Sequence, residues 1–260
     1  MRSVLLVPLA LALAACGGGG KSSGQPSNMT PVAYVKSSAV KTAQTPSEHV
    51  TLKGSLTVGT TLVTIDGMGD FDNAKKLGSM HADFSAAGLS GTLDEVLDGT
   101  TIYLQSPLLT SNLPKGKTWL KLDLQKAAPK GIDLSALTTQ SPTKLLSQLQ
   151  AAGNTTKVGD ETINGTATTH YRAKLEVSKL PKVAALANAT YGPLDIWIGN
   201  DDGYVHRLHT TYTIKAASAS AQSIAVTVDF SDFGKSVSVS VPAASATADG
   251  TGQAIPGLGG

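Results

Sequence analysis

The sequence has little of what many classes of function require. It holds one cysteine in 260 residues, which excludes a disulfide framework and a thiolate-rich metal site. Its 21 basic and 19 acidic residues nearly cancel, which argues against nucleic-acid binding, because that function needs a clustered basic surface. Aromatic residues make up 5% of the chain and hydrophobic residues 41%, enough for a core but too polar for a membrane bundle. This composition favours a β-rich binding scaffold over an enzyme.

Motifs for catalysis are also scarce. Ser38–Lys41 and Ser141–Lys144 both match the SxxK pattern of penicillin-recognising enzymes, but the partner motifs SDN and KTG are missing. We interpret both as positions on helix surfaces. His49, His81 and His170 stand alone among polar neighbours, which is typical of solvated surface histidines. The sequence therefore predicts no catalytic residue.

Two patterns bear on metal binding, and neither has the spacing of a site. His206 and His209 are three residues apart on a predicted strand, so their side chains should point to opposite faces. Asp66, Asp70 and Asp72 do not follow the order of an EF-hand loop. We expect no metal and no cofactor.

The amino terminus is typical of a bacterial lipoprotein precursor. Arg2 precedes an uncharged apolar run of about twelve residues, too short to span a bilayer but suited to a signal peptide. The run ends in Leu-Ala-Ala-Cys16, which resembles a lipobox, where the cysteine thiol accepts a diacylglycerol. We predict a signal peptide over residues 1–15, and an acylated Cys16, carrying chains such as palmitate, that holds the protein on the outer face of the cell membrane. An ordinary secretory signal and a buried free thiol are the alternatives.

The two ends of the mature chain are polar and rich in glycine. Residues 16–30 are predicted to be the lipidated cysteine and a flexible tether that reaches only about 20 Å from the membrane. Residues 242–260 are predicted to be a disordered tail. No linker divides residues 31–241, which we interpret as one domain.

Hydrophobic periodicity in this domain predicts an α+β fold. Helices are expected over residues 31–44, 143–152 and 178–189. Strands with alternating polar and apolar residues are expected over 50–58, 62–71, 77–85, 89–97, 100–105, 118–122, 156–162, 167–177, 194–198, 204–214 and 224–230. Roughly nine to eleven antiparallel strands would form a curved half-barrel wrapped over the few short helices. Glycines 67, 69, 78 and 91 would permit the bending.

The apolar face of this sheet is the candidate site. Its predicted cavity-lining residues are Leu56, Val58, Leu62, Met80, Phe84, Leu93, Leu97, Leu104, Tyr171, Leu175, Ile196, Ile198, Val226 and Val228. Few aromatic residues leave room for acyl chains, each buried CH₂ of which contributes roughly 0.8 kcal/mol. A dry, filled core remains the alternative interpretation of the same residues.

Several stretches follow one another along the chain in a characteristic order. They are the lipobox, the helix before HVTLKG, LDGTTIYLQ, DETINGTATTHYRAKLEV and PLDIWIGNDDG. In order and spacing, from residue 31 to about residue 233, they resemble one actinobacterial lipoprotein family, which includes the mycobacterial LppX and LprG proteins. The resemblance implies a LolA-like half-barrel that binds an acylated lipid or glycolipid, for transport or sensing in the cell envelope. It also implies an envelope transporter as a partner.

A second function stays open from the sequence. A structural or regulatory envelope lipoprotein with a filled core would act through protein–protein contacts. In either case we expect a monomer and no nucleic-acid partner.

Overall fold

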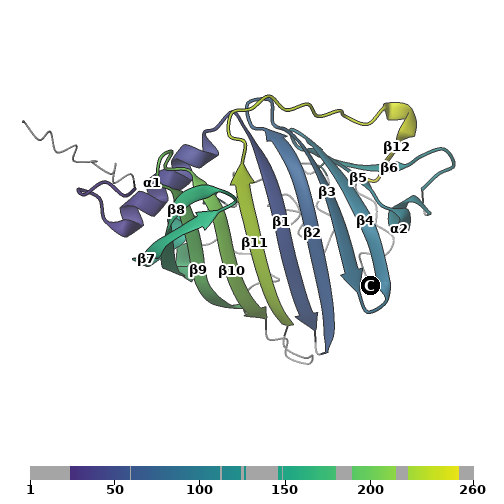
Figure 1. Ribbon diagram of the computed structural model, residues 1–260. Helices are drawn as coiled ribbons and strands as arrows, with labels where there is room; N and C mark the ends of the chain where they lie inside the picture. The colour runs from purple at the N-terminus through teal and green to yellow at the C-terminus, as the bar shows by residue number, and fades with distance from the viewer. Residues whose placement is uncertain are drawn as a thin grey trace, which may run out of the picture.

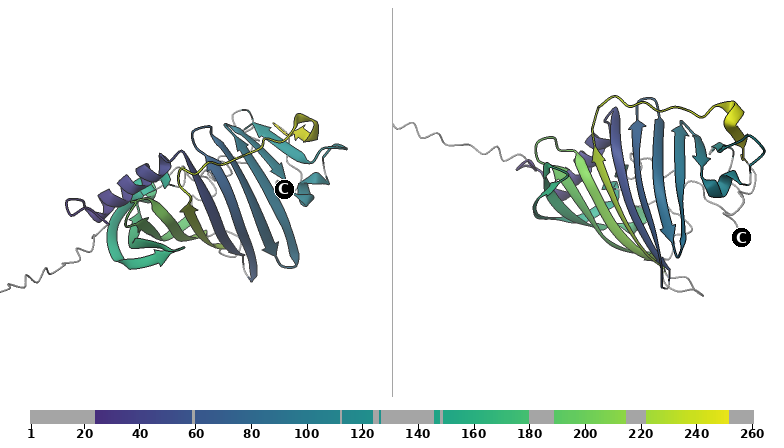
Figure 2. Two further views of the ribbon diagram at one scale, coloured as in Figure 1. Left: turned by 45° about the horizontal axis from the view of Figure 1, so that its top comes forward. Right: turned by 45° about the vertical axis from the view of Figure 1, so that its right-hand side comes forward.

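One large sheet of twelve strands forms the body of the protein (Figure 1). The computed structural model describes residues 24–58, 60–111, 113–123, 126, 146–147, 149–179, 189–214 and 222–251. The strand order is β12-β6-β5-β4-β3-β2-β1-β11-β10-β9-β8-β7, and every pair is antiparallel except β12–β6. The sheet is strongly curved and remains unclosed (Figure 2). A curved, mostly antiparallel sheet with few helices was the coarse prediction, and it is confirmed.

The strands agree with the predicted periodicity over most of their length. Their bounds are β1 (Ser47–Val58), β2 (Thr61–Asp72), β3 (Leu77–Ala86), β4 (Leu89–Asp98), β5 (Thr101–Gln105), β6 (Trp119–Asp123), β7 (Ala152–Ile163), β8 (Thr166–Leu175), β9 (Ala189–Gly199), β10 (Val205–Ile214), β11 (Gln222–Ser231) and β12 (Thr247–Asp249). Pairing of β1 with both β2 and β11 joins the amino-terminal and carboxy-terminal halves of the chain into one sheet.

The predicted first helix forms as α1 (Pro31–Ala43). The Thr30 side chain caps it by accepting a hydrogen bond from the amide of Ala33, and proline occupies its first turn. The helix packs mainly against β7, with smaller contacts to β8, β9 and β10. Ser38, expected on the helix surface, is buried instead, because it lies on the same side of α1 as Val35 and Ala39.

Three segments differ from the predicted elements. In the helix expected over 143–152, the described residues 146–147 are helical and a short 3₁₀ turn (η1, Leu149–Ala151) follows, but β7 begins directly after it and continues through Gly153. Most of the helix expected over 178–189 lies outside the described residues. Only a 3₁₀ turn (η2, Val177–Lys179) precedes them, and β9 starts at Ala189, five residues before its predicted start.

The carboxy-terminal segment also differs from expectation. Residues 242–251 were predicted to be disordered, yet they contain a 3₁₀ turn (η4, Ala244–Ala246) and the edge strand β12. This strand pairs in parallel with β6, and the Gly250 amide donates to the carbonyl of Lys121. The short segment lacks its own periodicity, so only the unpaired edge of β6 gives it a regular structure.

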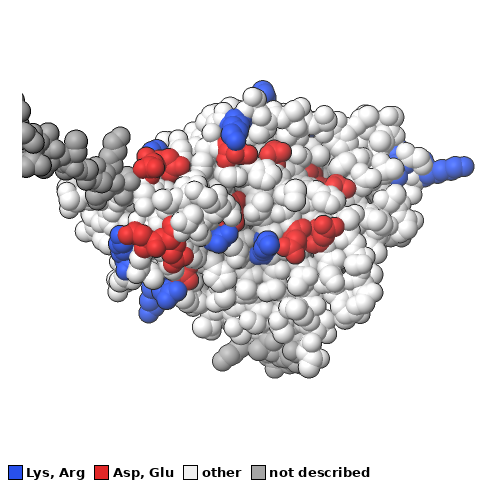
Figure 3. Space-filling model, viewed as in Figure 1, with Lys and Arg blue, Asp and Glu red and all other residues white. Residues whose placement is uncertain are grey.

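The sheet has two chemically different faces. The face that we call the α1 face carries Val50, Val228 and Ile196, and it packs against α1. The opposite face, called the charged face, carries Lys53 and Asp66 as a cross-strand pair and other charged residues along its strands. Figure 3 shows acidic and basic side chains gathered in a band across this charged face.

Glycines within the strands make room for aromatic rings. A Cβ atom added at Gly78 would lie 2.4 Å from the ring of Phe71, its cross-strand partner. The same relation joins Gly91 and Phe84, with 2.6 Å between the added atom and the ring. Both aromatic side chains therefore lie flat over a glycine, and the glycines are required by this packing as well as by the bending of the strands.

Candidate functional site

The α1 face contains two separate hydrophobic clusters. The first lies beneath α1 and includes Val35, Val50, Tyr171, Ile196 and Phe230, each no more than 2% exposed. The second lies toward the β12 edge and consists of Ile102, Leu104, Leu120 and Leu122. Two packed clusters on one continuous sheet face leave a stretch of apolar surface between them.

The strands β1 to β4 supply the surface between the clusters. Leu56 pairs with Val63, Ile65 with Phe84, and Ala82 with Leu93, so all six side chains belong to the α1 face. Ile65 is 40% exposed, whereas Leu56, Val63, Phe84 and Leu93 are partly buried. An apolar stretch that its own fold leaves partly open is the feature expected of a binding surface for an apolar ligand.

The predicted cavity residues are distributed over these three regions. The first cluster contains Tyr171, Ile196, Ile198 and Val228, with Met80, Leu175 and Val226 packed against it. The second contains Leu104, with Leu93 and Leu97 at its border. Leu56 and Phe84 lie between the clusters. Cys16 and the Val58 side chain lie outside the described residues.

One predicted residue lies on the wrong face. Leu62 pairs with Thr57, so its side chain belongs to the charged face, where it is 54% exposed. The residues of β2 that share the α1 face are odd-numbered and include Val63 and Ile65, so the even-numbered Leu62 is on the opposite face. The prediction for Leu62 is therefore wrong.

Polar atoms are few on the α1 face, and several lack partners. The Tyr171 hydroxyl, the Thr210 hydroxyl and one carboxylate oxygen of Glu48 are buried without a hydrogen-bond partner among the described residues. Burial raises the pKa of Tyr171. Burial also raises the pKa of Glu48 to about 7, although hydrogen bonds from Asn73 and Thr45 act in the opposite direction.

A second carboxyl group, Glu95, was not identified from the sequence. It pairs with Met80 on one side and Leu104 on the other, which places it on the α1 face. Burial raises its pKa to about 7. The alternation Leu89, Gly91, Leu93, Glu95, Leu97 contains the signal that could have revealed it, because a charged residue occupies an apolar phase.

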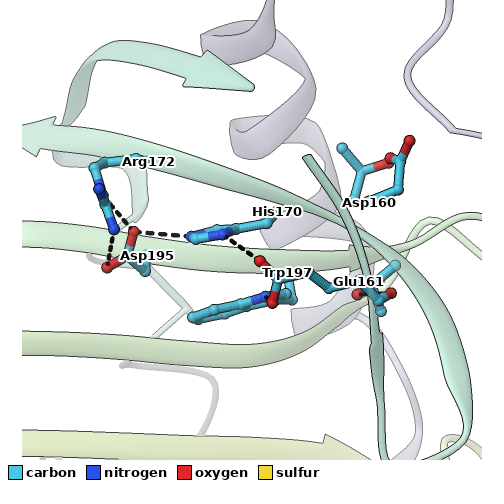
Figure 4. Close-up of polar contacts among 8 residues, drawn as sticks. Asp160, Glu161, His170, Arg172, Asp195 and Trp197 are labelled. Carbon is cyan, nitrogen blue, oxygen red and sulfur yellow. Dashed lines mark hydrogen bonds and ion pairs between the residues drawn. The ribbon is translucent and has the colours of Figure 1, made fainter. Parts of the chain in front are cut away.

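On the charged face, polar groups are instead paired closely. The ring nitrogens of His170 lie 2.9 Å from carboxylate oxygens of Glu161 and Asp195, and its ring stacks on Trp197 with centroids 4.2 Å apart (Figure 4). Arg172 donates a 2.7 Å hydrogen bond to Asp195. His170 was expected to be a solvated surface histidine, but it is only 5% exposed because these neighbours surround it. The network connects β7, β8 and β9, a structural role.

A shallow pocket also opens on the charged face. It has a volume of about 470 Å³, and its lining is Thr92, Asp94, Gln105, Pro107, Thr110 and Ser111. Asp94 already accepts a hydrogen bond of 2.6 Å from His81. None of the predicted cavity-lining residues borders this pocket, so it is not the predicted cavity.

Within the part of the chain that the structure describes, no group of three or more histidine, cysteine or acidic side chains is placed to hold a metal ion. None of the helices described is long and apolar enough to cross a membrane.

Known proteins similar to this chain include a family of lipoproteins and solved structures of mycobacterial lipoproteins. The family model of the LppX_LprAFG lipoproteins matches residues 30–239. The crystal structure of LprF from Mycobacterium bovis superposes with a TM-score of 0.50 at 16% identity, covering 85% of this chain and 99% of that chain. Lipoprotein LppX from Mycobacterium tuberculosis gives a TM-score of 0.48 at 18% identity, covering 80% and 97%. The LprF match shows a common fold.

A curated relative matches part of the chain. It is an uncharacterized 31.2 kDa protein from Streptomyces griseus, 27% identical over 154 residues, which are 52% of this chain. The chain spans about half the length of that relative, 48%.

Proposed function

The chain belongs to the LppX_LprAFG lipoprotein family, and on this premise we propose that it binds an acylated lipid on the α1 face of its sheet. The bound lipid or glycolipid would be carried or sensed in the cell envelope, without catalysis. The observation that carries this proposal is the partly open apolar surface between the two hydrophobic clusters, formed by β1 to β4.

The energetics of this surface suit an acyl chain. Each CH₂ group removed from water contributes roughly 0.8 kcal/mol, so a chain of about 16 carbons needs only partial burial for micromolar affinity. Ile65 and Phe84 form a cross-strand pair in this region and offer aliphatic and aromatic contacts. The acyl chain supplies most of the affinity, so the polar end of the ligand needs few hydrogen-bond partners and can serve to discriminate between lipids.

The location of the protein is part of the same proposal. Signal cleavage before Cys16 and acylation of its thiol would place the protein on the outer face of the cell membrane, with an envelope transporter as a possible protein partner. The family model begins at residue 30, so the matched domain would start a short tether away from the acylated cysteine.

Two β2 residues give a matched test. Ile65 lies on the α1 face and is 40% exposed, and Leu62 lies on the charged face and is 54% exposed. We expect Ile65→Ser in the full chain carrying Cys16→Ser to weaken binding of a fluorescent C16 fatty acyl probe about fivefold or more, because it removes apolar contact area. Leu62→Ser should leave the affinity unchanged.

Lipid extraction and mass spectrometry of the purified Cys16→Ser chain complete the test. Copurified acyl lipid, reduced in Ile65→Ser and kept at the wild-type level in Leu62→Ser, would support the proposal. An empty preparation that also ignores added acyl lipids would contradict it and favour the filled-core alternative, in which the protein acts through protein–protein contacts.

A further inference from the structure

Glu95 has an unusual position on the apolar sheet face. The register of β2 to β6 defines which residues share that face, and all of them are uncharged except Glu95. It thus presents the one ionisable side chain on the α1 face of these five strands. Its cross-strand neighbours are Met80 and Leu104, and its neighbours along β4 on the same face are Leu93 and Leu97.

Within the described residues, the Glu95 carboxyl group has no hydrogen-bond or charged partner that would offset the cost of its burial. No hydrogen bond or ion pair joins Glu95 to another residue in the described parts of the chain, whereas the charged-face residue Asp94, next to it in β4, is paired with His81. The short helix α2 (Pro107–Thr110), which also packs on β4, carries no titratable side chain. A carboxyl group that is partly buried among leucines without a partner costs stability unless it is protonated or meets a polar group.

From this placement we infer that Glu95 selects the polar end of the ligand: the site takes an acyl lipid with a free hydroxyl group in preference to the same acyl chain carrying a phosphate. The inference rests on the proposed function and concerns the same surface. It makes Glu95 a specificity-determining residue rather than a source of affinity.

The chemistry of the two headgroups decides between them. A hydroxyl group both donates and accepts, so it can hydrogen-bond a carboxyl group in either protonation state. A phosphate group offers mainly acceptors and brings negative charge next to a carboxyl group that has no compensating cation. An ammonium group could pair with the carboxylate, but burying that ion pair on an apolar face carries a desolvation penalty for both charges.

Protonation adds a second, measurable signature. Because burial already raises the pKa of Glu95, a ligand that covers the side chain removes more water and favours the protonated form further. Binding should therefore be coupled to proton uptake, and affinity should fall as the pH rises from about 6 to 8. The groups around Glu95 on β3, β4 and β5 are Met80, Leu93, Leu97 and Leu104, none of which titrates.

The experiment compares three C16 ligands with the full chain carrying Cys16→Ser. They are 1-monopalmitoylglycerol, its phosphate analogue palmitoyl lysophosphatidic acid, and palmitoyl lysophosphatidylethanolamine, which carries an ammonium group as well as the phosphate. Each is measured by calorimetry between pH 6 and 8. We expect the monoglyceride to bind about tenfold more tightly than lysophosphatidic acid at pH 7.

Two substitutions separate selection from affinity. Glu95→Leu should keep binding of both lipids but reduce the preference to about twofold or less, because the discriminating group is gone. Glu95→Gln retains a donor and an acceptor, so it should keep the monoglyceride affinity while its pH dependence disappears. Asp98→Asn, at the exposed end of the same strand, is the matched control and should behave as wild type.

The inference is overturned if Glu95→Leu retains the wild-type preference, or if the wild type binds the phosphate or the amine-bearing lipid as tightly as the monoglyceride. Thermal unfolding of each variant verifies that the fold is kept. Failure of every acyl lipid to bind the wild type contradicts the proposed function itself. Binding of all three without discrimination contradicts only the role of Glu95.

Discussion

The two faces of this sheet treat polar groups in opposite ways. On the charged face, Asp195 accepts hydrogen bonds from His170 and Arg172, and Arg207 forms an ion pair with Asp229. On the α1 face, Glu95 has no such partner among the described residues, and Glu48 has one unpaired oxygen. One sheet thus stabilises the charged form of a carboxylate on one face, at Asp195 in β9, and the neutral form on the other face, at Glu95 in β4 and Glu48 in β1.

This difference follows from the partners that each face supplies. Burial by itself would raise the pKa of Asp195, but hydrogen bonds from Arg172 and His170 hold it below its usual value. Burial is the only cause acting on Glu95, and it raises the pKa to about 7. Hydrogen-bond partners therefore decide the direction of the pKa shift, so the two faces of one sheet can favour opposite protonation states of a carboxyl group.

The largest effect should come from the packed part of the α1 face. Ile196 is fully buried beneath α1, so Ile196→Ala should lower the free energy of unfolding by about 3 kcal/mol, through lost transfer energy and a cavity. Urea denaturation measures the change. Thr190→Ala, an exposed position of the same strand, should change it by about 0.5 kcal/mol or less. Equal losses at the two positions would mean that the cluster beneath α1 is not a packed core.

The pH dependence of stability separates the two faces. The folded-state pKa of both Glu48 and Glu95 is raised to about 7 from 4.5, so their protonated forms stabilise the fold. This contribution to the free energy of unfolding is complete below about pH 4.5 and is lost as the pH rises through about 7, on the order of 3 kcal/mol per group. Glu95→Gln should reduce the decrease in the free energy of unfolding between pH 4.5 and 8, measured from denaturation curves. An unchanged decrease would contradict the burial of this carboxyl group.

The charged face should show a smaller effect with the opposite sign. The folded-state pKa of Asp195 is lowered, so its contribution is present above its unfolded value and is lost as the pH falls through the folded value. Asp195→Asn should lower the free energy of unfolding at pH 7 by about 1 to 2 kcal/mol, because the hydrogen bonds to His170 and Arg172 lose their charged acceptor. The loss should shrink below about pH 4. A loss independent of pH would show that shape, rather than charge, matters at this position.

Alternation of polar and apolar residues made most of the sheet predictable. It identified the strands that became β1 to β5, and it assigned most cavity candidates to the apolar face. The alternation failed at Leu62, because an apolar residue at the end of a strand can lie on either face of the sheet. Only the pairing of Leu62 with Thr57 shows that its side chain lies on the charged face. His170 was mistaken for a surface residue because its partners, Glu161 and Asp195, come from two other strands.

The sequence by itself determined the class of protein: the lone Cys16 in its lipobox-like setting, the alternating strands and the ordered motifs together predicted this lipoprotein family and its sheet. These are local patterns, which can be recognised in the sequence without knowledge of the three-dimensional structure. Only the tertiary structure decided that β12 pairs with β6 at the edge of the sheet and that Glu95 is the one ionisable residue on the α1 face of β2 to β6. Both depend on which strands become neighbours, and hydrogen-bond pairing between distant segments sets that order.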